Sequence, residues 1–231
     1  ATTPGSLRAL AGQVDPATYR VGPGDQFELN FSGRMTRTLP IVVGPEGTVF
    51  IPDAGAVRVS GLLLGEARRQ MLAAVGAHFP NVRADVRLSQ VRTFKVYLSG
   101  QVRFRGAVEV PAASRLSDVV LDSLLVPGAS LRNIEVRRAN PPGTSEAGDV
   151  DRFRRTGSRI RDPFLWDGDV VTVPMATRIV TVEGAVGRPS SYELATDDSI
   201  STLLALAGGL LPSADLRAQL RRFDATGQSQ L

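Results

Sequence analysis

The chain has 231 residues, of which 42% are hydrophobic, 23 are glycine and 15 are proline, a composition typical of turn-rich globular proteins. At this length we expect two or three small domains. The lack of cysteine excludes disulfides and cysteine-based metal or thiol chemistry, and no stretch approaches the roughly 18 apolar residues that a membrane-spanning helix needs.

Arginine dominates the basic residues. The formal net charge is only +4, and Lys95 is the sole lysine. Codon usage in a GC-rich genome is the explanation we prefer, because so small a net charge is a weak argument for a partner. Since guanidinium groups bind carboxylates and phosphates bidentately, an anionic partner stays open as the alternative.

Residues 1–18 are predicted to form an N-terminal arm. They show no sustained hydrophobic period and contain several glycines and prolines, so we expect them to become ordered only against another surface. The chain begins at Ala1 without a methionine or an apolar leader stretch, from which we expect a mature or trimmed form.

A tight turn opens the first structured region. Pro23 fixes its own φ and Gly24 tolerates positive φ, so Gly22 to Asp25 predict a turn. Apolar and polar residues then alternate over residues 26–31, which is typical of a half-buried strand.

The next stretch predicts a hairpin. A turn at residues 44–47 separates the apolar runs 41–43 and 48–51, and Pro52 ends the second run. A short strand is predicted at residues 57–59.

A helix and a strand follow. Residues 61–79 place apolar side chains on one helical face, and residues 82–88 alternate as a strand does. His78, the only histidine, is expected to cap the helix or lie on the surface rather than bind a metal. Residues 19–92 are therefore predicted to form a small β-rich domain with one helix.

Three sequence motifs of this domain resemble motifs of the polysaccharide export family and occur in the same order as in that family. They are Tyr-x-x-Gly-Pro-Gly-Asp starting at Tyr19, the turn and strand at residues 45–52, and the glycine-containing strand at residues 54–61. The family consists of outer-membrane proteins through which Gram-negative bacteria pass capsular polysaccharide and exopolysaccharide. The resemblance implies a polysaccharide export domain at residues 19–92.

An internal repeat occupies the remainder of the chain. Residues 96–102 match residues 180–186, which places the turn glycines Gly100 and Gly184 84 residues apart. Each copy reads strand, turn, strand, short helix and a further strand. The first helix is predicted at residues 115–125 with Ser114 as its cap. The second is predicted at residues 199–207, with Asp197 or Asp198 as its cap.

This order resembles the soluble-ligand-binding β-grasp module that follows the export domain in the family. It implies one module at residues 93–176 and a second, partial one at residues 177–231. The first copy closes with a turn at Gly168 and Asp169 that echoes Gly24 and Asp25. The second has no such ending, so we expect a truncated fragment or a module that another segment completes. The predicted fold class is α+β.

An arginine-rich insertion lies between residues 140 and 162. Its second part, residues 151–161, contains five arginines and suits contact with an acidic glycan, a neighbouring subunit or lipid headgroups. A solvated loop and edge strand explain the same charges, and we rank that explanation slightly higher. Candidate contacts for glycan or a subunit, chosen from charge alone, are Arg34, Arg37, Arg152, Arg154 and Arg155.

The sequence predicts no catalytic, cofactor or metal site. His78 lies in no serine motif, and no phosphate-binding loop or dinucleotide fingerprint occurs. Asp25 and Asp169 are expected to bond the backbone of their own turns rather than act in acid–base chemistry. We therefore predict that the protein is not an enzyme.

The resemblance implies a structural conduit. It implies a ring of identical subunits in the periplasm, attached to the outer membrane, with polysaccharide in transit and the inner-membrane polysaccharide co-polymerase as partners. The family crosses the membrane with a C-terminal amphipathic helix, which this chain lacks. The alternative is a soluble periplasmic glycan-binding or adaptor protein that forms no pore. A nucleic-acid binder is the third and weakest reading, because lysine is nearly absent and no motif matches.

Overall fold

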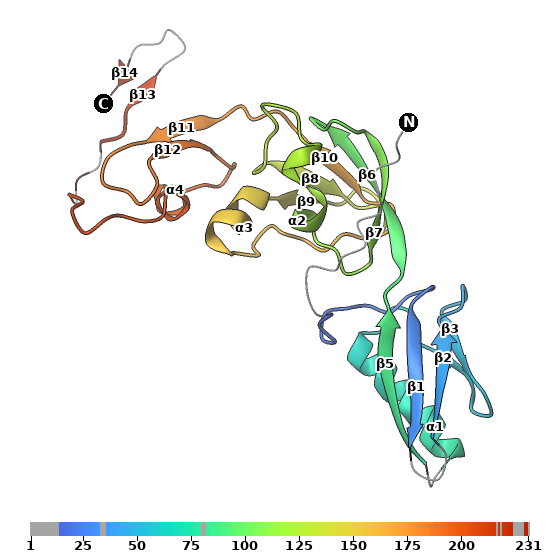
Figure 1. The fold of residues 1–231 in the computed structure, drawn as a ribbon. Helices are drawn as coiled ribbons and strands as arrows, with labels where there is room; N and C mark the ends of the chain where they lie inside the picture. The colour runs from blue at the N-terminus through green and yellow to red at the C-terminus, as the bar shows by residue number, and fades with distance from the viewer. Residues whose placement is uncertain are drawn as a thin grey trace.

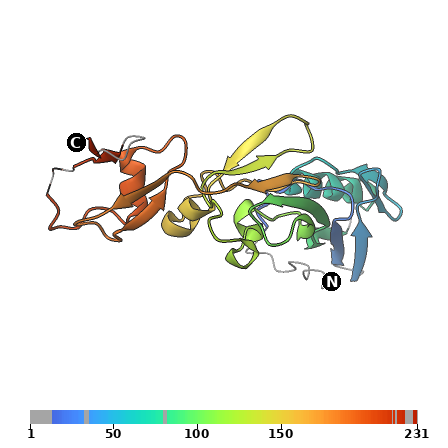
Figure 2. The ribbon, with the colours of Figure 1, turned by 90° about the horizontal axis from the view of Figure 1, so that it is seen from above.

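The computed structural model describes residues 14–32, 36–79, 82–215, 217, 219–223 and 229–230. Over these residues the chain is α+β, which confirms the predicted class. Helices and strands gather in three lobes, each around its own hydrophobic cluster, which we number in chain order. Figures 1 and 2 show the lobes following one another along the molecule.

The first lobe is a three-stranded antiparallel sheet, in the order β2-β1-β5, with a helix packed against it. Alternation along β1 buries Phe27 and Leu29 completely, and the helix contributes Met71 to the same cluster. The elements are β1 (Gln26–Ser32), β2 (Arg37–Val42), β3 (Thr48–Ile51), β4 (Gly55–Arg58), α1 (Leu64–His78) and β5 (Arg83–Gln90). His78 lies exposed at the end of α1, as expected, with Nδ1 3.1 Å from the carbonyl oxygen of Ala74.

The predicted hairpin between residues 41–43 and 48–51 is wrong. β2 pairs with β1, whereas β3 pairs with β4 in a separate two-stranded ribbon. The reason lies at Val43, whose N–H donates to the carbonyl oxygen of Asp25 at 2.9 Å. This bond extends the β1–β2 ladder up to the opening turn, so the chain must turn away before β3 begins.

The second lobe is a five-stranded sheet in the order β7-β6-β10-β8-β9. β10 runs parallel to β6 and antiparallel to β8, so it closes the module at the centre of the sheet. The elements are β6 (Thr93–Gly100), β7 (Gly106–Pro111), α2 (Leu116–Val119), β8 (Ile134–Arg137), β9 (Ser145–Gly148), α3 (Val150–Thr156) and β10 (Val170–Val173).

The predicted helix over residues 115–125 is shorter than expected. α2 ends at Val119 and is followed by a separate 3₁₀ turn, Asp122–Leu124. Val119 and Val120 are both buried and β-branched, which disfavours continuing the helix. The N-cap position is Arg115 rather than Ser114.

The predicted loop and edge strand over residues 151–161 is also wrong at its start, where α3 forms. The carboxylate of Asp149 accepts the backbone N–H of Arg152 at 2.8 Å, which caps the helix. Gly157, with φ of 72°, ends it in the left-handed conformation. These two residues are ordinary helix signals that the arginine-rich composition obscured.

The third lobe repeats the start of the second. Its strands β11 (Ile179–Val182) and β12 (Ser190–Glu193) form an antiparallel pair, and α4 (Ile200–Leu206) follows. Ser199 caps α4 by accepting the N–H of Thr202, so the predicted caps Asp197 and Asp198 are wrong. Two short strands, β13 (Arg222–Phe223) and β14 (Ser229–Gln230), pair with each other.

The two copies of the repeat differ in how their helices are covered. Leu116 of α2 is fully buried, whereas Ile200, its counterpart in α4, is 63% exposed. Gly148 packs so closely against α2 that a Cβ added to this glycine would lie 2.1 Å from Leu116 Cδ2. In the second lobe, β10 pairs with the edge of β6 that β7 leaves open. Among the described residues, no strand pairs with the corresponding edge of β11.

A buried arginine joins the second and third lobes. Arg132 is 1% exposed, and its Nη2 lies 2.7 Å from Asp149 Oδ2 while its Nη1 lies 2.6 Å from Asp198 Oδ2. Nη1 also donates to the carbonyl oxygen of Glu193 at 2.7 Å. Burial would lower the pKa of Arg132, but the hydrogen bonds to both carboxylates outweigh it and raise the pKa, so the guanidinium stays charged.

We predict that Arg132→Ala lowers the free energy of unfolding by about 3–5 kcal/mol, because it leaves two buried carboxylates without their cation. Urea unfolding followed by circular dichroism measures the loss. Arg69→Ala is the matched control, since its ion pair with Glu66 is exposed and should contribute nothing measurable. Equal stability of both variants would show that the Arg132 contacts do not hold the lobes together.

Candidate functional site

The two predicted Gly-Asp turns have the same construction. Asp25 Oδ2 accepts the N–H of Gly22, and Asp169 Oδ2 accepts the N–H of Trp166, each at 2.8 Å and three residues back along the chain. Each carboxylate is fully buried and also binds an arginine, Arg92 at 2.9 Å and Arg138 at 2.5 Å. These carboxylates therefore hold the fold rather than face a reactant.

Asp25 is also the centre of a small buried network. The hydroxyl of Tyr19 donates to Asp25 Oδ1 at 2.6 Å, and the backbone N–H of Arg92 donates to the same oxygen at 2.8 Å. Residue 92 lies where the first lobe passes into the second. The opening turn is thus tied to the junction between the lobes.

The arginines chosen from charge alone do not form one site. Arg34 lies outside the described residues, and Arg37 is exposed at the start of β2. On α3, Arg154 pairs with Asp122 and Arg155 pairs with Asp151. Neither these residues nor Arg152, on the same helix, line the cleft described next.

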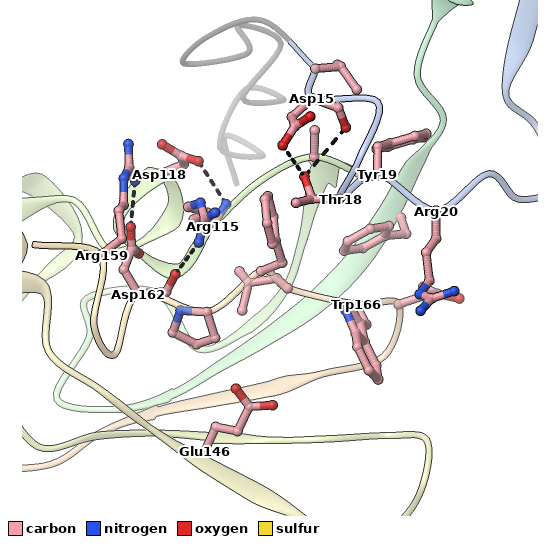
Figure 3. Close-up of a pocket in the computed structure, with 18 of the residues that line it drawn as sticks. Asp15, Thr18, Tyr19, Arg20, Arg115, Asp118, Glu146, Arg159, Asp162 and Trp166 are labelled. Carbon is pink, nitrogen blue, oxygen red and sulfur yellow. Dashed lines mark hydrogen bonds and ion pairs between the residues drawn. The ribbon is translucent and has the colours of Figure 1, made fainter. Parts of the chain in front are cut away.

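An open cleft of about 920 Å³ lies between residues 14–20 and residues 163–167 (Figure 3). Its floor is the extended segment that leads into β10. This segment pairs with the start of α2, because Leu116 donates its N–H to Pro163 O at 2.9 Å and Leu165 donates to Ser114 O at 3.0 Å. Extended backbone sends alternate side chains to opposite sides.

That alternation aims two aromatic rings at the cleft. Leu165 is 1% exposed in the core, while Phe164 and Trp166 on either side of it line the cleft. Trp166 is 48% exposed, and the buried guanidinium of Arg138 lies 4.6 Å from its ring centre. One side of the indole therefore rests on a fixed cation, which leaves the other side accessible.

Asp162 holds two of the arginines that line the cleft. Asp162 is 1% exposed and accepts hydrogen bonds from the N–H and hydroxyl of Ser117 at 2.9 and 3.0 Å. Its carboxylate also pairs with Arg159 at 2.6 Å, and its backbone oxygen accepts Nη1 of Arg115 at 2.8 Å. The donors are thus fixed before any ligand arrives.

Two arginines of the cleft are left without a carboxylate in the described part of the chain. Arg20 Nη1 donates only to the carbonyl oxygen of Gly61, at 2.9 Å. Arg115 donates to a carbonyl oxygen and lies 3.7 Å over the ring of Phe164. Within the described residues no ion pair includes either side chain. Most N–H donors of the two guanidinium groups are therefore available to an anionic ligand.

The sequence analysis missed this cleft. Its walls come from residues far apart in the chain, namely Arg20, Arg115 and Trp166, and the pairing that joins them is long-range. The local signal was the alternation of Phe164, Leu165 and Trp166, which predicts two aromatic rings on one side of an extended segment.

Tyr19→Phe tests the network around Asp25. Burial raises the pKa of Tyr19, and the hydrogen bond to Asp25 raises it further. The hydroxyl's contribution is therefore complete below the unfolded pKa of about 10 and falls as the pH rises above it. We expect a loss of about 1.5–3 kcal/mol at neutral pH, because the hydroxyl donates to a charged group.

The difference in the free energy of unfolding between the wild type and Tyr19→Phe should become smaller when urea unfolding is repeated above pH about 10. Tyr97→Phe is the control, since that ring is 45% exposed and its loss should leave the free energy of unfolding nearly unchanged. A difference that stays constant with pH would contradict the role of the neutral hydroxyl.

Comparisons with known proteins find matches to two parts of the chain. The family model described as polysaccharide biosynthesis/export protein matches residues 13–89, and the SLBB domain model matches residues 179–230. Two curated proteins of Escherichia coli, each named polysialic acid transport protein KpsD, are 26% identical over 182 residues. The alignment covers 76% of this chain but spans only 31% of the length of each relative.

The export-family match falls on the first lobe and the SLBB match on the third, in the order that the sequence resemblance implied. Across the ranges the structure describes, no helix combines the length and apolarity that crossing a bilayer demands. The chain is therefore similar to the polysaccharide export family over its first lobe and to the SLBB domain over its third.

Proposed function

We propose that this protein is a structural subunit of a polysaccharide export conduit, that several copies assemble into a closed ring in the periplasm, and that the ring attaches to the outer membrane. The matches of the first lobe to the export-family model and of the third lobe to the SLBB model support a role in polysaccharide export. The relatives are named for polysialic acid transport, so the cargo proposed here is a capsular polysaccharide or exopolysaccharide. The inner-membrane polysaccharide co-polymerase is the proposed partner, and we propose no enzymatic activity.

The proposed division of labour follows the lobes. Residues 19–92 are the export domain, residues 93–176 a first β-grasp module and residues 177–231 a second. A conduit needs subunit contacts and a hydrated interior rather than a reactive centre. The buried carboxylates of Asp25 and Asp169 fit this role, because each accepts a backbone N–H and pairs with an arginine of the fold.

The observation that carries the proposal is a set of exposed apolar side chains on the third lobe. Ile179, Ile200 and Leu210 are 57%, 63% and 54% exposed, on a lobe whose fully buried cluster is small. Exposed apolar side chains and an unpaired strand edge, here that of β11 in the described residues, favour association. We propose that a second copy covers these side chains, since head-to-tail contacts that close generate rings.

Native mass spectrometry over a concentration series tests the assembly. We expect the wild type to form a discrete oligomer and Ile200→Glu to shift it towards the monomer, because a charge would be buried at the contact. Phe50→Glu is the matched control, since Phe50 is 68% exposed on the first lobe and should leave the oligomer intact.

A wild type that stays monomeric at every concentration would contradict the ring. That result would favour the alternative, a periplasmic glycan-binding or adaptor protein that forms no pore.

A further inference from the structure

We propose that the cleft beside Trp166 binds acidic sugar units of the polysaccharide, with the free face of the indole against one sugar ring. Arg20 and Arg115 lie on opposite sides of the cleft in Figure 3, so each would contact the carboxylate of a different unit. The inference rests on the proposed function, because it names the substrate class that the export subunit contacts. No family match covers residues 163–167, which supply the aromatic floor.

The aromatic floor determines what kind of group can bind. Trp166 is half exposed although one side of its ring lies against the buried guanidinium of Arg138. An aromatic face with an accessible side packs well against a flat, mainly C–H surface whose edges carry polar groups. A pyranose ring has that form, and its hydroxyl groups can reach the fixed donors and acceptors around the indole.

The polar groups of the wall are placed in advance. Glu146, 50% exposed, receives both Nε and Nη2 of Arg138, so its carboxylate stands beside the indole as an acceptor for sugar hydroxyls. Figure 3 shows Trp166 and Arg20 on the same side of the cleft, with Glu146 on the chain below them. Fixed partners reduce the side-chain ordering that binding would otherwise require.

Charge selects an acidic sugar over a neutral one. The guanidinium groups of Arg20 and Arg115 donate hydrogen bonds to backbone carbonyl oxygens alone, so most of their N–H donors remain available. A sugar carboxylate accepts such donors bidentately, in the strongest common hydrogen-bond geometry.

The cleft argues against a polyphosphate or a nucleic acid. Besides its arginines it is lined by Asp15, Asp118, Glu146, Asp162 and Asp167, which would repel a closely spaced row of phosphates. Its volume of about 920 Å³ lies within the usual range for small-molecule sites, about 300–1,000 Å³. One acidic unit and its neighbours in a chain suit this mixture better than a continuous anion.

The test uses the fluorescence of Trp166, which is the only tryptophan in the chain and therefore reports on the cleft alone. Short oligogalacturonate and short oligosialate serve as acidic probes. Fully methyl-esterified oligogalacturonate is the matched neutral probe, because it keeps the backbone and loses the charge. We expect saturable quenching or a spectral shift with at least one acidic probe, at least tenfold weaker binding of the ester, and weaker binding at high salt.

Variants assign the residues. Arg20→Gln and Arg115→Gln should each weaken the acidic probe about tenfold, by loss of a charge-assisted bond. Arg37→Gln, an exposed arginine outside the cleft, should change nothing. Trp166→Ala, followed by calorimetry because it lacks the fluorophore, should weaken binding about tenfold, whereas Trp166→Phe should recover part of it.

Several results would overturn the inference. They are failure of both acidic probes to bind, equal binding of the ester and the acid, or equal losses in Arg37→Gln and Arg20→Gln. Native mass spectrometry of Trp166→Ala separates the two proposals, because an intact oligomer that no longer binds glycan leaves the assembly untouched. A monomeric wild type that still binds the acidic probe would contradict the ring and retain the sugar site.

Discussion

The guanidinium of Arg132 lies between Asp149 of the second lobe and Asp198 of the third, and it is 1% exposed. A buried cation is tolerated only where its hydrogen bonds are satisfied, and here two carboxylates and a backbone carbonyl satisfy it. A lysine could not replace it, because the planar fork reaches both carboxylates at once. Arg132 therefore helps to fix the second and third lobes relative to each other, together with contacts such as Asn133 Nδ2 to Glu193 Oε1 at 2.8 Å.

The same device recurs at the two Gly-Asp turns, where Arg92 and Arg138 bind the buried carboxylates Asp25 and Asp169. This recurrence bears on the arginine-rich composition, for which codon usage is the simplest explanation. Codon usage can supply arginines, but it does not place them against buried carboxylates. These arginines stabilise two turns and the joint between the second and third lobes.

Two copies of one repeat have different surroundings. In the second lobe, β8 and β10 and the residues around Gly148 enclose the core, and Leu116 is completely buried. In the third lobe the equivalent Ile200 faces outwards. The start of the fold is repeated while its cover is not, so the third lobe keeps apolar side chains exposed and the second contributes the floor of the cleft.

Local patterns predicted much of the fold. Alternation identified β1 and β5, helical spacing identified α1, and the repeat of 84 residues aligned β6, β7 and α2 with β11, β12 and α4. Errors arose where one local sequence pattern was compatible with two different structures. Charge obscured the capped helix α3, and the turn before β3 gave no sign that Val43 is bonded to Asp25.

The candidate site was the least predictable part. Turn chemistry correctly suggested that Asp25 and Asp169 bond their own backbone, but it carried no information about their arginine partners. The cleft unites Arg20, Arg115 and Trp166 from three distant parts of the chain. The pairing of residues 163–165 with residues 114–116 brings Arg115 and Trp166 together, and Arg92, whose Nη1 donates to the carbonyl oxygen of Arg20 at 3.2 Å, adds Arg20. No local period encodes these contacts.

Site-specific photo-crosslinking tests whether the third lobe is a contact between subunits. The chain has no cysteine, so Ile200→Cys or Phe50→Cys introduces the only attachment point for a photoactivatable label. We expect a ladder of crosslinked chains from position 200 and none from position 50. Monomers alone from both positions, or equal ladders from both, would show that the third lobe is not the contact between subunits.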